Sequence, residues 1–580
     1  MSEVSLFNWT SDYFIKNKSA CTNIIENLKD TTEIPSLNAV DIQDLQDGQL
    51  VRFRGMVQDM YNPEFYFQSY EVINKKTGEG NVKSGLYKDS ASCQEDEDIA
   101  MDSEKNITSE RQILVVITVP GLNEWAKEKK VKIASKSEQM SSSTSSSTKR
   151  PHEESVDEPM DTSAPLHKKE KTNDNTDNKT ENKNVFSKEH FLNFPIPSND
   201  GKTCIVKIYD ESAQYKLNQI LDIIGFISLD PMLSQVSNFD DMMEDAEIQT
   251  HHPPASIVPR LHAMKITEIK KNNNINQEII SKAQTIRGDL HMVLSQLLFG
   301  DSLVADYVIC HLISSVYLRK DFLPLGNFPL NITNFPVDKC PTFAADFYSI
   351  ISKLVPKSYL FECTLDSLND LSLIPKKDYE SNRLTSGVLQ LSDNTHLVID
   401  ETKLSAGQLS PAGRQNYEAI SGLVVAQKLT YDFKFNNIEY DTDIPVLILS
   451  ESKSFIPCFM HTPLKIDEET EKLYPQVVEA AGQYLKDENR LNDIRQYLEI
   501  SRNQSFNLGD DVLEVVQDDF VKLRQSNKTV NADNLNMLLV LARFMALSYG
   551  QTSLTVDCWK KTLEMENERL ARLPPRKTTL

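Results

Sequence analysis

Residues 297–307 read Leu-Leu-Phe-Gly-Asp-Ser-Leu-Val-Ala-Asp-Tyr, an apolar run followed by a glycine turn and a second apolar run. A phosphate-binding loop has this shape: backbone N–H groups surround the phosphates, and a Lys and a Ser or Thr follow to hold phosphate and Mg²⁺. Gly300 and Asp301 would open such a loop, but Asp306 and Tyr307 stand where the Lys and the hydroxyl residue belong. Because a carboxylate repels a triphosphate, the motif predicts a nucleotide-binding frame without its chemistry.

A second motif lies at 397–401, where the sequence reads Leu-Val-Ile-Asp-Glu. Folds with a phosphate loop use an apolar strand ending in acidic residues to hold magnesium and orient the attacking group. Each motif alone also fits a simpler interpretation, because Gly-Asp-Ser is common at an N-cap and many buried strands end in acidic turns. The predicted degenerate nucleotide pocket consists of Gly300, Asp301, Asp306, Tyr307, Asp400 and Glu401.

The composition limits the classes of partner. The chain has 580 residues, which suggests roughly three to four domains. Its formal net charge is −22, from 62 basic and 84 acidic residues, and this charge opposes direct contact with nucleic acid. The 8 cysteines form no Cys-x-x-Cys pair, so we expect no zinc site, and with a degenerate nucleotide pocket we expect no cofactor. Without a secretory signal or a membrane-spanning run, the chain is expected to be soluble, intracellular and without membrane contact.

The N-terminal part alternates apolar and polar residues in several short stretches. Apolar spacing over 1–45 predicts short helices, and 49–75, 112–120, 203–209 and 220–229 predict strands. Strands separated by a long polar insertion predict a small β-barrel of OB type. OB barrels bind single strands by stacking bases on aromatic residues in a basic groove, and here aromatics occur with few clustered cations. These aromatics are Phe53, Tyr61, Phe65, Tyr66 and Phe67.

A polar segment from about 130 to 190 interrupts the predicted barrel. It is rich in Ser, Thr, Lys, Glu, Asp and Asn, so it cannot bury enough apolar surface to offset its ordering entropy and is predicted to be disordered. Basic clusters within it have the separation of a bipartite nuclear import signal, although a solvated charge run would look similar. We therefore expect a nuclear protein. The predicted import signal consists of Lys149, Arg150, Lys168, Lys169 and Lys171.

The second half alternates short apolar strands with longer segments. Strand patterns at 359–364, 387–391, 397–399 and 446–449 predict an α/β layer. After about residue 470 the apolar spacing is helical to the end, with Asn531 as a predicted N-cap. A compact helical lid after an α/β layer is the expected architecture.

This half resembles the ATPase module of the minichromosome maintenance (MCM) helicase subunits. Gly300-Asp301 is similar to the start of their Gly-Asp-Pro-x-x-x-Lys-Ser loop, and the segment 382–391 leads into Val398-Ile-Asp-Glu401 as a similar segment does there. Ser450-Glu451 stand where a polar sensor residue would be expected, and no Ser-Arg-Phe-Asp-like arginine-finger segment precedes the helices. The resemblance therefore implies a degenerate AAA+-like domain, a pseudo-ATPase.

As a whole, the chain resembles the MCM-binding protein family. The resemblance covers nearly all residues outside 78–110 and 130–190 and rests on long motifs, found at 51–66, 253–260, 300–307, 323–326 and 398–402. It implies a nuclear, non-enzymatic partner of MCM helicase subunits that reaches chromatin only indirectly. Such proteins act in DNA replication and the cell cycle: they promote removal of the helicase from chromatin in late S phase, support subunit assembly and contribute to sister chromatid cohesion, cell division and mitosis.

The expected fold class is α/β plus β, and two rival functions stay open. One is a weak ATPase in which Asp400 and Glu401 hold magnesium, and the other is an OB-fold replication factor that binds single-stranded DNA. The predicted segments are N-terminal helices at 1–45, an OB-like barrel with a disordered insertion at 46–235, an acidic linker at 236–284, a degenerate AAA+-like (MCM-like) domain at 285–470 and a helical lid at 471–580.

Overall fold

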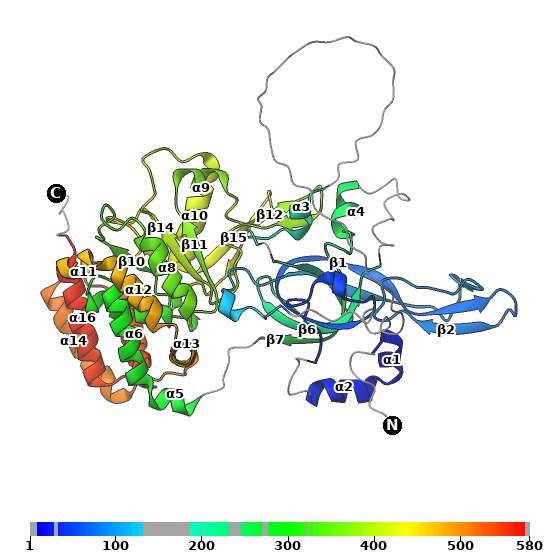
Figure 1. The fold of residues 1–580 in the computed structure, drawn as a ribbon, viewed down its shortest axis with the longest axis horizontal. Helices are drawn as coiled ribbons and strands as arrows, with labels where there is room; N and C mark the ends of the chain where they lie inside the picture. Colours follow the sequence, from blue (N-terminus) through cyan, green and yellow to red (C-terminus); the bar gives the residue numbers. More distant parts are fainter. Residues whose placement is uncertain are drawn as a thin grey trace, which may run out of the picture.

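The chain is a mixed α/β protein with an antiparallel barrel on one side and a helix-covered parallel sheet on the other (Figure 1). The predicted import signal lies outside the described residues, as does most of the segment predicted to be disordered. The computed structural model describes residues 9–27, 33–130, 186–198, 200–230, 245–269, 276–320 and 323–574.

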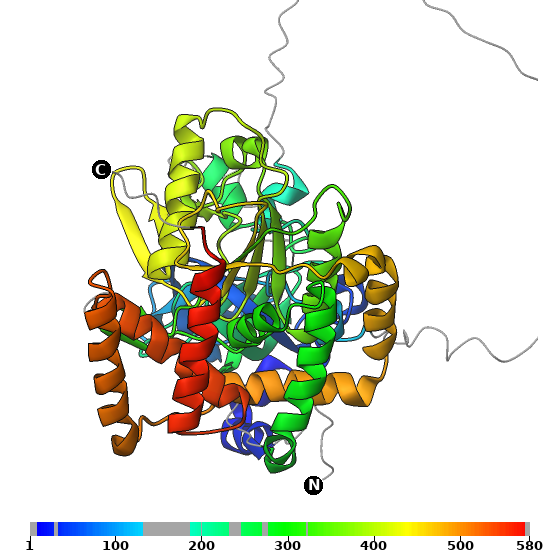
Figure 2. The same ribbon diagram turned by 90° about the vertical axis from the view of Figure 1, so that its left-hand side faces the viewer.

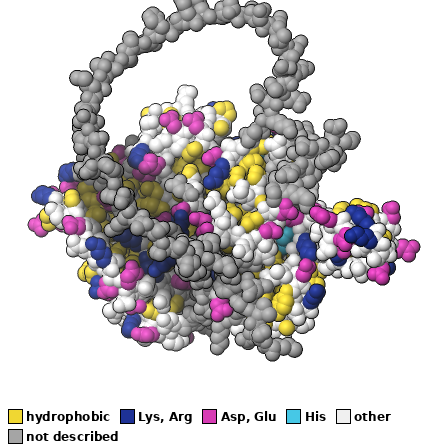
Figure 3. Space-filling model, turned by 45° about the vertical axis from the view of Figure 1, so that its right-hand side comes forward, with side chains coloured by type: hydrophobic (Ala, Val, Ile, Leu, Met, Phe, Trp, Pro, Cys, Tyr) yellow, Lys and Arg dark blue, Asp and Glu magenta, His cyan; other side chains and the backbone are white. Residues whose placement is uncertain are grey.

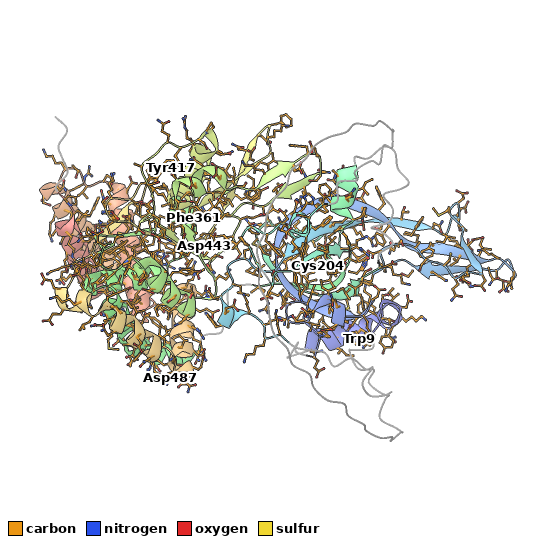
Figure 4. The ribbon with its side chains drawn as sticks, turned by 45° about the horizontal axis from the view of Figure 1, so that its top comes forward. Trp9, Cys204, Phe361, Tyr417, Asp443 and Asp487 are labelled. Atoms are coloured by element: carbon orange, nitrogen blue, oxygen red, sulfur yellow. The ribbon has the colours of Figure 1, made fainter. Side chains whose placement is uncertain are left out.

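The barrel is a closed ring of paired strands. β1 pairs with both β4 and β6, β4 with β5, and β7 closes the ring by pairing with β5 in parallel and with β6 in antiparallel. Apolar side chains from alternate positions fill its interior, and Cys204 lies among them (Figure 4). The predicted strands are confirmed, whereas β7 follows a Pro-rich segment and was not expected from its pattern. The strands are β1 (Leu50–Asn74), β4 (Ile107–Ile117), β5 (Thr203–Ile208), β6 (Ile220–Ser228) and β7 (Arg260–Glu268).

β1 is 25 residues long and continues beyond the barrel. There it pairs with β2 (Gly80–Ser84), β3 (Glu97–Ile99) and the first half of β4, and the resulting small sheet projects away from the body (Figure 1). Three irregularities in its pairing with β4 let one strand bend out of the ring. We call residues 64–110 the arm.

Two short helices cover one side of the barrel, as the N-terminal spacing predicts. α1 (Ser11–Lys16) is capped by Thr10, and α2 (Lys18–Asn27) follows at once. Trp9, labelled in Figure 4, packs in the same buried cluster as Phe226 of β6. Burial of these side chains fixes the helices on the barrel.

The second sheet is entirely parallel, with the strand order β11-β14-β17-β10-β18. Side chains alternate between its two faces: Val398 and Leu447 pack with α7 and α8, whereas Leu397 and Ile399 pack with α10. The strands are β10 (Leu330–Thr333), β11 (Ser358–Glu362), β14 (His396–Asp400), β17 (Val446–Leu449) and β18 (Met460–Pro463), and the helices are α7 (Ser302–Leu312), α8 (Phe343–Leu354), α9 (Leu365–Asp370) and α10 (Pro411–Ala426).

The predicted strands at 359–364, 397–399 and 446–449 are confirmed, but the strand predicted at 387–391 is wrong. That segment is a turn whose backbone passes so close to Ile374 that a Cβ on Gly387 would lie 2.3 Å from the Ile374 carbonyl carbon. Its apolar residues are buried by loop packing, which gives the same pattern as a buried strand.

A smaller mixed sheet, ordered β13-β12-β15-β16 with β12 and β15 parallel, adjoins the barrel, and β8 and β9 form a separate hairpin. Two short helices, α3 and α4, lie on the barrel side of this sheet (Figure 1). The bounds are β8 (Leu318–Lys320), β9 (Leu323–Leu325), β12 (Lys376–Asp378), β13 (Arg383–Thr385), β15 (Lys428–Asp432), β16 (Asn437–Asp441), α3 (Lys188–Leu192) and α4 (Asp245–His251).

The C-terminal helices do not form a separate layer of their own. They share one core with α6 and α7, which come much earlier in the chain, and Figure 2 shows α6 in green beside the orange and red helices. The predicted cap at Asn531 is confirmed, since its side chain accepts from the Asn534 N–H in a capping box. These helices are α5 (Gln277–Ser281), α6 (Ala283–Leu297), α11 (Glu468–Lys472), α12 (Tyr474–Tyr484), α13 (Glu488–Asn503), α14 (Asp510–Ser526), α15 (Ala532–Ser548) and α16 (Val556–Arg572).

Buried hydrogen bonds hold the barrel against the parallel-sheet side. The Leu384 N–H donates to Asp59 Oδ2 at 2.7 Å, and Gln390 Nε2 donates to the Gln58 carbonyl at 2.9 Å. Asp59 is 3% exposed, and burial raises the pKa of its carboxyl to about 6. Because a buried polar group that loses its partner is costly, these bonds favour one arrangement of the two sides.

Candidate functional site

The carboxyl ends of parallel strands form the usual ligand edge of an open α/β sheet. Asp400 and Glu401 lie there, at the end of β14, as the sequence predicts. Asp400 Oδ1 accepts from the N–H and Oγ1 of Thr402, at 3.0 and 2.6 Å. This carboxylate therefore holds its own turn.

Glu401 is 8% exposed and is fully engaged with the loop after β17. Its carboxylate accepts from Ser454 Oγ at 2.8 Å and from the N–H groups of Phe455 and Ile456 at 3.1 and 3.2 Å. Burial raises the pKa of Glu401, and these three donors partly oppose that rise. Within this structure, Glu401 acts as a loop-positioning residue.

The loop 334–342 also lies at this edge, where it joins β10, the first strand of this sheet in chain order, to α8. It contains no glycine, and Pro336 and Pro341 have no N–H to offer a phosphate. The N–H groups of Val337, Lys339 and Cys340 donate to carbonyls within the loop. It cannot surround a phosphate with backbone donors, which is what a phosphate loop does.

Lys339 in this loop does not replace the lysine of a phosphate site. Its Nζ pairs with Glu471 Oε2 at 2.5 Å, and its side chain is 67% exposed. The first turn of α8 is likewise not open to a ligand, since Phe343 is buried against Phe299 and Phe335. The sequence pattern did not predict this loop, because β10 reads Leu-Asn-Ile-Thr and lacks the continuous apolar run that marks β17.

The segment expected to be the phosphate loop lies elsewhere. Gly300, with φ +83°, and Asp301 form the turn between α6 and α7, so a helix and not a strand precedes them. Asp301 caps α7, accepting from the Leu303 N–H at 3.1 Å, and also pairs with Arg572 Nη1 at 2.5 Å. The segment 300–307 is therefore a turn between two helices and the start of the second, whereas a phosphate loop follows a strand.

Asp306 and Tyr307 are structural residues of the helical core. Asp306 Oδ1 lies 2.5 Å from Arg287 Nη2 of α6. Tyr307 is fully buried, and its hydroxyl donates to Glu566 Oε2 of α16 at 3.0 Å. Burial and the nearby Glu566 carboxylate raise the pKa of Tyr307 far above its ordinary value. Asp306 connects the consecutive helices α6 and α7, and Tyr307 connects α7 to α16, which is distant in sequence.

The predicted pocket is not assembled as one site. Asp301 contacts the loop after β18, where it accepts from the Lys465 N–H at 2.8 Å, whereas Asp400 ends β14. β17 and β10 lie between these strands, a separation of about 14 Å at the usual strand spacing. Among the described contacts, no hydrogen bond or ion pair joins 300–307 to Asp400 or Glu401.

A cavity of about 970 Å³ lies where the barrel meets the smaller mixed sheet. Its lining includes both apolar and charged residues, and Tyr215, Phe433 and Tyr440 are among them. In the described ranges, no group of three or more His, Cys, Asp or Glu side chains is placed to hold a metal ion. None of the described helices is long and apolar enough to cross a membrane.

A profile of the family described as Mini-chromosome maintenance replisome factor matches residues 21–573. The chain belongs to this family. This match includes the barrel, the parallel sheet and all of the described C-terminal helices, so the family assignment applies to both sides of the structure.

Curated relatives agree with this assignment. The chain is 36% identical to the Mini-chromosome maintenance complex-binding protein of Rattus norvegicus, over 94% of this chain and 92% of that one. The proteins of the same description from Homo sapiens and Drosophila melanogaster are each 35% identical, over 94% and 93% of this chain and 91% and 92% of theirs. The chain therefore spans nearly the full length of these members of the Mini-chromosome maintenance replisome factor family.

Proposed function

We propose that this protein binds the mini-chromosome maintenance complex as a non-enzymatic partner in DNA replication. The observation that carries this proposal is the match along nearly the whole chain to relatives described as binding that complex. The formal net charge of −22 favours a protein partner over nucleic acid, whose phosphates carry charge of the same sign.

We further propose that the two sheets are an OB-type barrel and an AAA+-type core. The ring β1-β4-β5-β7-β6, with its parallel β5–β7 contact, supports the first assignment. The parallel order β11-β14-β17-β10-β18 supports the second, because β10, the first strand of this sheet in chain order, lies between the fourth, β17, and the fifth, β18. The helices that share a core with α6 and α7 would then be the lid.

In this proposal the AAA+-type core is a pseudo-ATPase that mimics a helicase subunit. The loop 334–342 has too few free N–H groups for a phosphate, and Asp400 and Glu401 hold turns of the protein itself. Such a mimic would occupy an interface between helicase subunits without completing the ATP site there. Because it would bind open rings more tightly than closed rings, it would weaken ring closure. Removal of the helicase from chromatin in late S phase, support of subunit assembly and a role in sister chromatid cohesion would follow from this one property.

Nuclear location is part of the same proposal, with Lys149, Arg150, Lys168, Lys169 and Lys171 as the import signal. Its support is the basic clustering within a polar segment. Alanine at all five positions should move a fluorescently tagged full-length protein to the cytoplasm, whereas unchanged nuclear accumulation would remove this part of the proposal.

The test of the main proposal uses the purified full-length protein. It should co-sediment with the purified mini-chromosome maintenance complex, and titration calorimetry with Mg-ATP should give no binding heat at micromolar concentrations. Failure to co-sediment would overturn the binding role. Micromolar Mg-ATP binding would instead support the weak ATPase.

A single-strand DNA-binding function has less support. Phe53 is buried in the barrel, Tyr61 stacks on His251 with ring centroids 3.9 Å apart, and Tyr66 packs against Tyr209. Among the aromatics proposed for stacking, Phe65 is 76% exposed. Strongly salt-dependent binding of an oligonucleotide by the full-length protein would favour this second function.

A further inference from the structure

The arm exposes an apolar face that the rest of the described structure leaves uncovered. Strand register places Val82 opposite Glu71 and Ile107 opposite Ser69, so these side chains lie on one face of the arm, together with Ile73. Ile107 is 54% exposed, Val82 is 55% exposed and Ile73 is 38% exposed. We call Ile73, Val82 and Ile107 the arm face.

The opposite face of the same strands is covered, which shows that the exposure is one-sided. Tyr70 and Val72 of β1 are 0% and 1% exposed, and the Tyr70 hydroxyl donates to the Ser92 carbonyl of the loop that crosses them. The arm therefore already has its packed core. Apolar residues on the arm face add nothing to that core, and strand residues facing water are normally polar.

Charges around the arm face are unbalanced. Residues 64–110 contain 11 acidic and 5 basic residues, a net charge of −6, and of these carboxylates Glu64 and Asp89 pair with Lys207 of the barrel. Four of the lysines are in ion pairs: Lys75, Lys83, Lys88 and Lys105. In contrast, several carboxylates have no cation within 4 Å among the described residues: Glu79, Glu95, Asp96, Asp102, Glu104 and Glu110. Figure 3 shows charged side chains gathered on this projection.

We propose that the arm face docks on an apolar surface bordered by Lys and Arg residues on a subunit of the mini-chromosome maintenance complex. This inference rests on the proposed binding function and adds to it the surface and the chemistry of its partner. Burial of aliphatic side chains supplies affinity, and the unpaired carboxylates supply steering and register against the basic border.

Charge also decides between possible occupants. Two copies of this chain that met through their arm faces would bring two charges of −6 together, and like charges across an interface cost several kcal/mol in general. A nucleic acid would meet the same repulsion. A basic-bordered protein surface is the occupant that complements both the apolar face and the carboxylates.

The test compares matched double variants of the full-length protein for binding to the purified mini-chromosome maintenance complex. Val82→Ser with Ile107→Ser should weaken binding about tenfold or more, while the thermal unfolding midpoint stays unchanged because both side chains are exposed. Val521→Ser with Leu570→Ser, at 52% and 50% exposure on α14 and α16, should leave binding unchanged.

A charge-reversal variant tests the contribution of the unpaired carboxylates. Glu95→Lys with Asp96→Lys should weaken binding and reduce its dependence on salt, whereas Lys76→Ala should not. Wild-type affinity for the Val82 and Ile107 variant would overturn the inference, and so would an equal loss in the Val521 and Leu570 control. If the wild type forms a dimer and the Val82 and Ile107 variant does not, the arm face binds a second copy of this chain, and the proposal is wrong. No binding by the wild type would overturn the proposed function instead.

Discussion

The substitution Asp306→Lys places a lysine where the sequence pattern of a phosphate loop expects one. The structure predicts that it destabilises the protein and creates no nucleotide site. Asp306 Oδ1 lies 2.5 Å from Arg287 Nη2, and the two side chains are 16% and 6% exposed. Arg287 also donates to Ser548 Oγ at 2.9 Å and stacks over the Tyr549 ring, so it cannot turn away from the new charge.

The size of the effect follows from this geometry. Removing one partner of a buried ion pair costs about 3–5 kcal/mol, because the other charge stays buried alone. Since Asp306 is 16% exposed, the lower end of that range applies, about 3 kcal/mol, and repulsion between Lys and Arg287 adds to it. A loss of about 3 kcal/mol lowers the unfolding midpoint by about 6–12 °C for a cooperative unit of about 150–250 residues.

Scanning calorimetry of the full-length variants measures the midpoint, and titration calorimetry with Mg-ATP measures nucleotide binding. Asp306→Asn, Arg287→Met and their combination complete a double-mutant cycle, in which the double variant should lose less than the sum of the single losses. A wild-type midpoint for Asp306→Lys would refute the structural role of the pair. Mg-ATP binding gained by this variant would show that 300–307 is a phosphate loop after all.

Three further outcomes are expected. Tyr307→Phe removes one hydrogen bond to Glu566 and should cost about 1 kcal/mol in the free energy of unfolding, measured by chemical denaturation. Asp59→Ala leaves the Leu384 N–H buried without an acceptor, should cost about 1–3 kcal/mol, and should speed hydrogen exchange at that amide. Burial lowers the pKa of His311 to about 4, so its contribution to stability is complete above the ordinary pKa of about 6.5 and is lost as pH falls towards 4. Between pH 7 and pH 5 the free energy of unfolding of His311→Gln, measured by chemical denaturation, should therefore fall by about 2 kcal/mol less than that of the wild type. The same pH dependence in both proteins would contradict the burial of a neutral His311.

Local pattern alone predicts much of the fold. Alternation over 49–75 gives β1, the apolar run before Asp400 gives β14, and Asn531 with its helical spacing gives α15. Each of these depends on a few neighbouring residues, because side-chain period and capping are local properties. The acidic end of β14 is likewise correctly placed at the carboxyl edge of the parallel sheet.

The position of the other motif could not be predicted in this way. Gly300 and Asp301 have the same turn and capping pattern between two helices as they would have between a strand and a helix. β10, which leads into the loop 334–342, reads Leu-Asn-Ile-Thr and so lacks the continuous apolar run that marks the equally short β17, Val-Leu-Ile-Leu. Its neighbours β17 and β18 come from residues more than a hundred positions later, so only their pairing shows that 334–342 lies at the edge.

The sequence by itself therefore determined the identity of most elements, the acidic character of the chain and the family to which it belongs. The tertiary structure decided which elements meet. It placed α6 and α7 among the C-terminal helices, gave Asp306 and Tyr307 buried partners there, and left the arm face exposed. The physical reason is that helix and strand periods arise from adjacent residues, whereas ion pairs, ligand edges and exposed faces arise from contacts between segments that the chain brings together only on folding.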